Sequence, residues 1–320
     1  MAHVSVSMIV KNEALRLRQA LTSLQALEQI DEVVVLDTGS TDATMDIARD
    51  MGARVFEQPW QDDFSFHRNH CLSLCKNDWV FIIDGDEVLE DPGDLDAFLA
   101  HPTGDGALVR IQTEAGGTRC EAFLSIRAFN RQHARWRHPI HNQLVGIKNP
   151  RGTSAMMTAH YEPSDHQAQR RRLKVLLGAL EAEPTCSHHL YFVAKTYRSL
   201  SEWEAAMHYI DRCLATDGAD AHPILYAWRV EANLELGRQD AAVDCLIEGL
   251  RRHPTLPDLC FYDFLFAAKR WYEVSASPPV SYLLAPSIST HHAARFPEMA
   301  KALGLPVEFA DAEPNEETAS

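Results

Sequence analysis

The sequence predicts an α/β protein in which a Rossmann-like domain with a mostly parallel sheet is followed by a smaller α-helical repeat domain. Short apolar runs alternate with helical patterns over residues 4–83, as in βαβ units. An acidic turn, Asp84-Gly85-Asp86, follows the last of these runs. From residue 167 onward the periodicity is almost entirely helical.

The sheet is expected to begin with a strand, a helix and a second strand. Residues 4–10 alternate apolar and polar side chains, and residues 13–27 place leucines at helical spacing. Residues 33–36 form a continuous apolar run, which is typical of a strand buried on both faces of a parallel sheet. In such sheets ligands bind beyond the carboxyl ends of the strands. The same pattern then predicts helices at 43–51 and 65–76 and strands at 54–56 and 79–83.

The rest of this domain mixes strands with turns and a basic loop. Residues 107–112, 122–129 and 143–147 have strand patterns separated by turn residues. We expect them to form an antiparallel extension that covers the site.

The helical part contains an internal repeat. Leu190 and Glu204-Ala205-Ala206 recur as Tyr226 and Asp240-Ala241-Ala242. Paired helices with small residues at this spacing indicate tetratricopeptide-like units. The predicted domains are 1–163 for the α/β domain, 164–275 for the repeats and 276–320 for an extension with an acidic, flexible tail.

Composition indicates a folded cytoplasmic protein. Apolar residues make up 46% and charged residues 23% of the chain, and the net charge is −15, which disfavours a broad nucleic-acid-binding surface. No apolar run is long enough to span a membrane, and no leader is apparent. The seven cysteines are scattered and odd in number, as expected of reduced thiols. Cys71 and Cys75 are expected in the core.

The motif Asp84-Gly85-Asp86-Glu87 is the strongest chemical signal. An Asp-x-Asp turn after a buried strand can hold a hard divalent cation that bridges two phosphates. An acidic turn at a strand end is the structural alternative. The tripeptide alone does not decide between them.

Further motifs around this turn favour the metal-site interpretation. They are Val10-Lys11-Asn12-Glu13, the segment Leu36-Asp37-Thr38-Gly39-Ser40-Thr41-Asp42, Phe64-Ser65-x-x-Arg68-Asn69, and Trp79 five residues before Asp84. Together they resemble glycosyltransferase family 2, closely over 4–90 and more loosely over 105–255. The resemblance implies the GT-A fold and, more narrowly, the branch with tetratricopeptide-like repeats that includes sublancin-type peptide S-glycosyltransferases. It also implies inverting transfer from a nucleotide-diphosphate sugar, with a UDP-sugar as donor and Mn²⁺ or Mg²⁺ as cofactor.

The resemblance assigns roles on the donor side. It implies that Asp37 accepts a hydrogen bond from the base and that Val10 and Lys11 lie along the nucleoside. Arg68 would approach the nucleotide as a planar cation. For Asn12 and Glu13 a helix start is an equally good explanation. In the acidic motif the resemblance places Asp84 near the ribose and metal, Gly85 beside the donor, and Asp86 as a direct metal ligand.

A further metal ligand and the candidates for the general base follow residue 120 in the sequence. His141 falls where related sequences have a His-Glu pair, so the resemblance implies that it completes the metal shell. Asn142 replaces the acid of that pair, and an amide does not take a proton at neutral pH. The remaining candidates for the base are Glu121 and Asp165. His160 is either near the site or structural at the domain junction.

Other polar and aromatic residues can be explained either by a functional or by a purely structural role. The arginines at 127, 131, 135 and 137 could grip phosphate or an anionic acceptor, and the run 170–172 is expected to be a solvated helix face. Phe64, Phe66 and Trp79 are expected in the core rather than stacked on a base.

Two rival functions remain at this point. A nucleotidyltransferase would use similar acidic ligands, but it would carry a glycine-rich loop after the first strand, which residues 10–13 lack. A non-catalytic repeat scaffold with a degenerate GT-A domain is left open by Asn142. The acceptor is unspecified among peptide, glycan, lipid-linked sugar and modified nucleobase, and the repeats offer a surface for a second copy of the chain or another protein.

Overall fold

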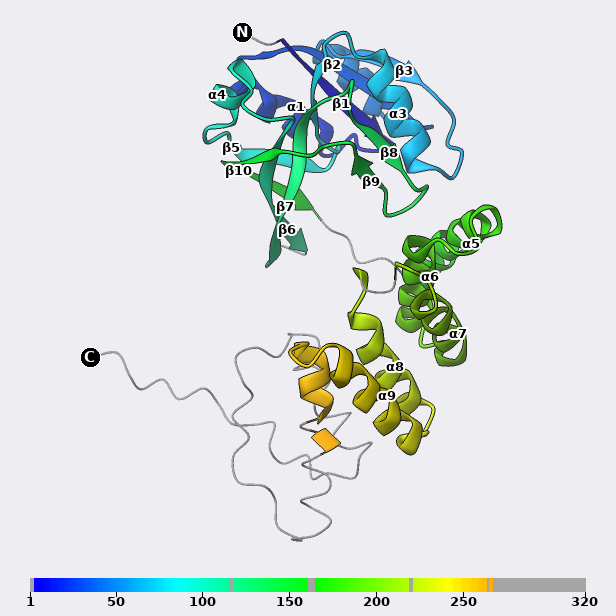
Figure 1. Ribbon diagram of the computed structural model, residues 1–320. Helices are drawn as coiled ribbons and strands as arrows, with labels where there is room; N and C mark the ends of the chain where they lie inside the picture. The colour runs from blue at the N-terminus through cyan, green and yellow to red at the C-terminus, as the bar shows by residue number, and fades with distance from the viewer. Residues whose placement is uncertain (1–2, 116–117, 161–164, 219–220, 264, 267–320) are drawn as a thin grey trace, which may run out of the picture. The chain divides into compact units, whose positions relative to one another are not determined.

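The computed structural model describes residues 3–115, 118–160, 165–218, 221–263 and 265–266 (Figure 1). The chain divides into two compact units, residues 1–179 and 180–320. The predicted boundary at 163 lies just before the helix that spans this division, and the predicted extension 276–320 lies outside the described residues. No described helix is both long enough and apolar enough to cross a membrane.

A mixed eight-stranded sheet forms the centre of the first unit, with strand order β3-β2-β1-β4-β7-β6-β10-β5. The strands β3, β2, β1 and β4 run parallel to one another, as the sequence predicts. The bounds are β1 Val4–Val10, β2 Ile30–Asp37, β3 Arg54–Glu57, β4 Trp79–Ile82, β5 Glu87–Asp91, β6 Gly106–Ala115, β7 Thr118–Asn130 and β10 Pro150–His160, with β8 Arg135–Arg137 and β9 Gln143–Val145 in a separate pair.

Helices cover both faces of the parallel half. On one face α1 (Leu17–Ser23), α2 (Thr44–Asp50) and α4 (Leu95–Ala100) pack with the side chains of β1. On the other face α3 (Phe64–Leu74) packs Cys71 and Cys75 against β2 and β4. This double burial explains the continuous apolar run of β2. It also confirms Cys71 and Cys75 as core residues, and burial raises the pKa of the Cys71 thiol to about 11.

The second half of the sheet departs from the prediction. β7 lies between β4 and β6 and is antiparallel to both, whereas β10 returns parallel to β6 and antiparallel to β5. The strands β5, β8 and β10 and the helix α4 were not expected from the sequence. The helix predicted at 13–27 is also shorter, since α1 begins at Leu17 and a 3-10 turn follows at Leu24–Ala26.

The described part of the second unit contains paired helices, as the repeat predicts. After α5 (His166–Ala182), the pair α6 (Ser187–Ser199) and α7 (Trp203–Leu214) is followed by α8 (Ile224–Glu235) and α9 (Gln239–Arg252). The repeated small residues Ala206 and Ala242 are both fully buried. Small side chains at these positions let the helices of each pair approach closely.

Candidate functional site

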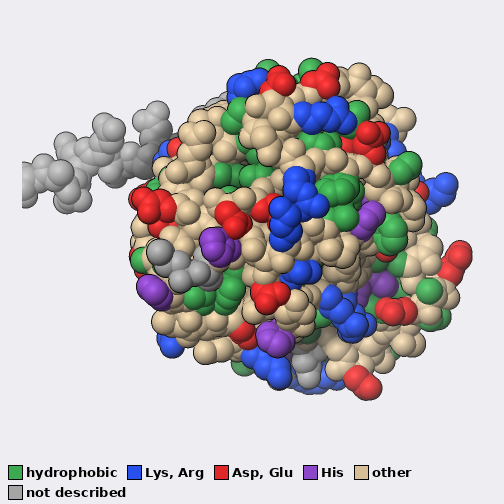
Figure 2. Space-filling model, turned by 90° about the horizontal axis from the view of Figure 1, so that it is seen from above, with side chains coloured by type: hydrophobic (Ala, Val, Ile, Leu, Met, Phe, Trp, Pro, Cys, Tyr) green, Lys and Arg blue, Asp and Glu red, His purple; other side chains and the backbone are tan. Residues whose placement is uncertain are grey.

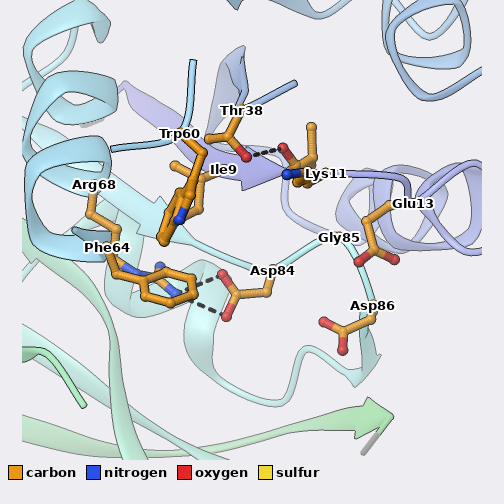
Figure 3. A pocket seen from close by; sticks show the side chains of 11 residues that line it. Ile9, Lys11, Glu13, Thr38, Trp60, Phe64, Arg68, Asp84, Gly85 and Asp86 are labelled. Atoms are coloured by element: carbon orange, nitrogen blue, oxygen red, sulfur yellow. Dashed lines mark hydrogen bonds and ion pairs between the residues drawn. The ribbon is translucent and has the colours of Figure 1, made fainter. Parts of the chain in front are cut away.

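A pocket of about 250 Å³ opens at the carboxyl ends of β1 and β4 (Figure 3). Seven of the nine residues that the sequence assigns to the donor line it. These are Val10, Lys11, Glu13, Arg68, Asp84, Gly85 and Asp86, and the remaining lining residues are Ile9, Thr38, Trp60 and Phe64.

The arginine of α3 reaches the acidic motif from the opposite wall. Arg68 Nη2 donates to both carboxylate oxygens of Asp84, at 2.8 and 3.0 Å. Its guanidinium also lies over the ring of Trp136, 4.9 Å from the centroid. The helix that carries Arg68 begins at Phe64, where the Asp63 side chain accepts from the N–H of Phe66 at 2.8 Å, an ordinary N-cap. The backbone therefore fixes where this cation points.

A buried ion pair anchors the acidic turn to β7. Glu87 accepts the N–H of Asp84 at 2.9 Å, and Arg127 of β7 donates to both of its carboxylate oxygens at 2.7 and 2.8 Å. Both side chains are less than a tenth exposed. The suggestion that Arg127 could grip phosphate is therefore wrong, because its guanidinium is committed to Glu87. Its role is to fix the turn that carries Asp84 and Asp86.

Three carboxylates share the pocket, namely those of Glu13, Asp84 and Asp86 (Figure 3). Burial and the charge of Asp86 raise the pKa of Glu13 to about 7. Burial and the charge of Asp84 likewise raise the pKa of Asp86. A site that crowds anionic oxygens in this way favours a hard divalent cation, because the cation relieves their repulsion and oxygen is its preferred ligand. The side chains present fit Mn²⁺ or Mg²⁺.

A histidine lies beside this acidic group. The N–H of His160, the last residue of β10, points to the carbonyl of Asp86 at 3.4 Å. The pairing of Ala159 with Glu87 brings the two strands to this position.

Asp37 and Asn12 are not among the residues that line the pocket, and both bond to the turn after β2. Asp37 Oδ1 accepts the N–H groups of Gly39 and Ser40, both at 2.8 Å. Asp37 Oδ2 is buried and has no hydrogen-bond partner within the described part of the chain. Asn12 has a positive φ of 58° and accepts the N–H of Thr41 at 2.8 Å. It therefore ties the end of β1 to the turn after β2 and does not start a helix.

The remaining predicted residues lie elsewhere. His141 is exposed at a positive φ of 51° and does not line the pocket. Asp165 accepts the N–H of Ala168 at 2.6 Å and so caps α5. Glu121 is on β7, and its side chain is outside the described part of the structure. Neither His141 nor Asp165 is among the residues that line the pocket.

Two aromatic residues were missed as pocket residues. Trp60 and Phe64 line the pocket edge to face, with centroids 4.6 Å apart. Trp60 also stacks on His67 at 4.9 Å. Phe64 and Phe66 are about two-fifths exposed, so the expectation that they are core residues is wrong. Trp79 does pack inside, against Phe98.

Comparison with known proteins finds a family model that matches part of this domain. Residues 5–142 match the family model described as Glycosyl transferase family 2. A TPR repeat-containing protein of Synechococcus elongatus is 38% identical over 144 residues, 44% of this chain and 35% of that protein. The SPbeta prophage-derived glycosyltransferase SunS of Bacillus subtilis is 32% identical over 87 residues, 27% of this chain and 20% of that protein. The chain thus spans about a third or less of the length of these relatives.

Among solved structures, S. aureus TarS 1–349 is similar to this chain with 15% identity and a TM-score of 0.45. The similarity covers 79% of this chain and 92% of that one.

Proposed function

Since residues 5–142 form a glycosyltransferase family 2 domain, we propose that the chain transfers a sugar from a nucleotide-diphosphate donor to a nucleophilic acceptor. One observation carries the proposal: Arg68, Asp84, Asp86 and Glu13 face one pocket beyond the strand ends. An acidic pocket would repel a diphosphate unless a cation lay between them. Arginine and a divalent ion together supply that positive charge.

Asp86 and Asp84 would hold Mn²⁺ or Mg²⁺, with the imidazole of His160 beside them. The ion, when bound, supplies Lewis-acid stabilisation of the departing diphosphate. His160 is a candidate because its backbone N–H contacts the carbonyl of Asp86. The metal role of His141 stays a prediction from the family resemblance.

The protein side chains provide binding and orientation. Trp60 and Phe64 offer an apolar wall for the nucleoside or sugar, and Arg68 presents a planar cation to the phosphates. Inversion requires the acceptor to attack the anomeric carbon from the face opposite the leaving group. Asp165 caps a helix, so Glu121 is the proposed base among the two predicted candidates. The donor is proposed to be a UDP-sugar.

The test is hydrolysis or transfer with a panel of nucleotide sugars in Mn²⁺, comparing Asp86→Asn with Glu90→Gln. Glu90 is exposed on the neighbouring strand β5 and serves as the matched control. We expect release of a nucleoside diphosphate by the wild type and Glu90→Gln, and a loss of at least about 100-fold in Asp86→Asn.

Each alternative function gives a different result in this assay. Release of pyrophosphate from a nucleoside triphosphate would indicate a nucleotidyltransferase. Absence of both nucleotide-sugar binding and turnover, with the fold intact, would indicate a scaffold.

A further inference from the structure

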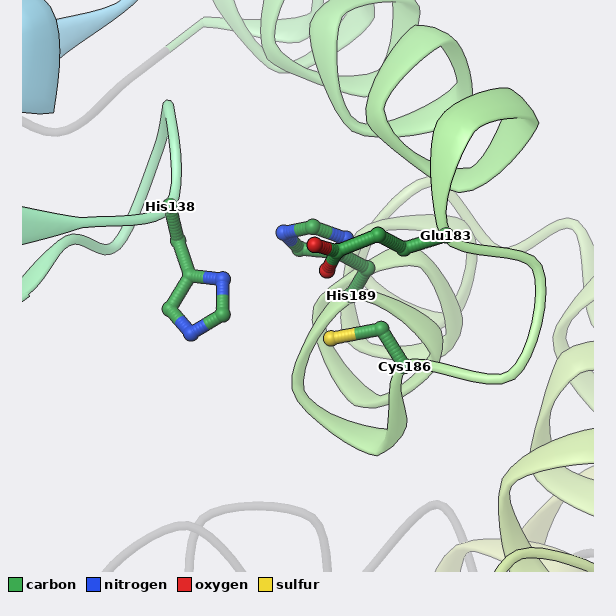
Figure 4. A group of neighbouring side chains, drawn as sticks. All are labelled: His138, Glu183, Cys186 and His189. Carbon is green, nitrogen blue, oxygen red and sulfur yellow. The ribbon is translucent and has the colours of Figure 1, made fainter.

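The turn between α5 and α6 brings together a carboxylate, a thiol and an imidazole. Glu183, Cys186 and His189 place their ligand atoms within 4.8 Å of one another (Figure 4). All three belong to the second compact unit. His138, also drawn in Figure 4, belongs to the first unit and takes no part in this inference. We propose that Glu183, Cys186 and His189 bind one zinc ion.

The backbone sets the distance between the first two ligands. The N–H of Cys186 donates to the carbonyl of Glu183 at 3.1 Å, which closes a four-residue turn. Pro184 occupies its second position, where the fixed φ of proline favours such a turn. Arg212 of α7 donates to the carbonyl of Pro184 at 3.0 Å. The turn is therefore held both by its own hydrogen bond and from the neighbouring helix.

The first turn of α6 sets the position of the third ligand. Cys186 is the N-cap residue of this helix, and the N–H of Leu190 donates to its carbonyl at 3.0 Å. His189 follows three residues after Cys186, a spacing that puts two side chains on the same helix face. His189 is buried, Cys186 is half-buried and Glu183 is exposed. The group is therefore reached from solvent on the Glu183 side.

The donor atoms favour zinc over the ions proposed for the sugar-donor pocket. A tetrahedral Zn²⁺ with bonds of about 2.0–2.3 Å places its ligand atoms roughly 3.5 Å apart, so side-chain rotations suffice to close this group. Thiolate and imidazole ligands select Zn²⁺ against Mg²⁺ and Mn²⁺. Three protein ligands leave the fourth position to water. The bound ion would fasten the turn to α6 and stabilise the first helix pair.

Cobalt substitution tests the site in the purified full chain. After chelator treatment and dialysis, Co²⁺ is titrated into the wild type, Cys186→Ser, Glu183→Gln and two controls. The controls are Cys260→Ser, which removes an exposed thiol elsewhere in the chain, and Glu181→Gln, which removes an exposed neighbouring carboxylate. A thiolate-to-cobalt charge-transfer band reports a Co–S bond, which the carboxylate-rich donor pocket cannot produce.

We expect the band, saturating at one Co²⁺ per chain and displaced by Zn²⁺, in the wild type and both controls. It should be absent in Cys186→Ser, and Glu183→Gln should bind at least about tenfold more weakly. Circular dichroism in chelator should show that all variants are folded. Absence of the band in the folded wild type, or its persistence in Cys186→Ser, would overturn the proposal.

Discussion

Arg68 is held between an acid and an indole. Its Nη2 lies 2.8 Å from Oδ1 and 3.0 Å from Oδ2 of Asp84, and its guanidinium carbon lies 4.9 Å from the centroid of the Trp136 ring. The same ion pair leaves Asp84 anchored to the protein, whereas burial and neighbouring charge raise the pKa of both Glu13 and Asp86. Asp84 and Asp86 are therefore not equivalent, although the sequence motif presents them as a pair.

Replacing Arg68 with lysine tests whether the planar guanidinium matters. Lysine keeps the charge but can neither contact Asp84 in this way nor stack on Trp136. We expect kcat/KM for the donor to fall by about 10- to 100-fold, the range for losing a positioned charge in a transition state. Arg110→Lys, on an exposed residue of β6, is the control. Equal kcat/KM for Arg68→Lys and wild type would show that charge alone suffices.

Breaking the Glu87–Arg127 pair should cost stability as well as activity. Arg127→Met leaves the Glu87 carboxylate buried and without its main partner, which destabilises a protein by about 3–5 kcal/mol. Urea unfolding measures this loss. The double variant Glu87→Gln, Arg127→Met removes the buried charge and should regain much of the stability. It should not regain activity, because the turn at Asp84 keeps only a neutral amide as its anchor. Stability equal to wild type in Arg127→Met would refute this account.

The parallel half of the sheet was predictable because its signals are local. β2 and β4 contain short continuous apolar runs, as expected of strands buried on both faces. β1 shows the alternation typical of a strand, and helical patterns separate these segments. β10 gives no such signal, since its first half is largely exposed. Its pairing with β5 and β6 joins segments far apart in the chain. That pairing brings the backbone of His160 to Asp86, whereas the sequence left His160 either near the site or structural.

The difference between local signals and long-range contacts also applies to the residues of the site. Glu13, Asp84 and Asp86 follow strands that the sequence predicts, and Arg68 lies in a predicted helix whose motif the family resemblance assigns to the donor. Trp60 lies in the loop between β3 and α3, where no periodicity assigns a side chain to a surface. Its part in the pocket follows from the path of the loop, which stacks it on His67.

Glu13 should make the stability of the metal-free protein depend on pH. Its pKa in the folded protein is raised to about 7 from an ordinary value of 4.5. Its favourable contribution is therefore fully present below the unfolded pKa and is lost as pH rises through about 7. We expect Glu13→Gln, measured by calorimetry in chelator, to melt above wild type at about pH 8, and the difference to vanish towards about pH 4.5.

Two controls separate this effect from others. Glu90→Gln removes an exposed carboxylate and should show no such difference. Added Mn²⁺ should reduce or reverse the advantage of Glu13→Gln at about pH 8, because a charged Glu13 then faces a cation. A melting difference that is the same at both pH values would mean that ionisation of Glu13 is not its cause.

Position 85 should require glycine because a larger side chain would collide with Glu13. A Cβ atom at this buried position would lie 2.8 Å from Cγ and 3.1 Å from Cβ of Glu13, and 3.3 Å from Cγ1 of Val10. Gly85→Ala must therefore displace Glu13 from the acidic group. We expect a loss of about 1–3 kcal/mol in stability, as for other overpacked sites, and weaker Mn²⁺ binding by calorimetric titration. Adding Glu13→Ala removes the 2.8 Å contact with Cγ and should restore part of the stability but not the Mn²⁺ affinity. Gly152→Ala, whose Cβ would meet nothing within 4 Å, is the control. Wild-type Mn²⁺ affinity in Gly85→Ala would show that Glu13 takes no part in binding the ion.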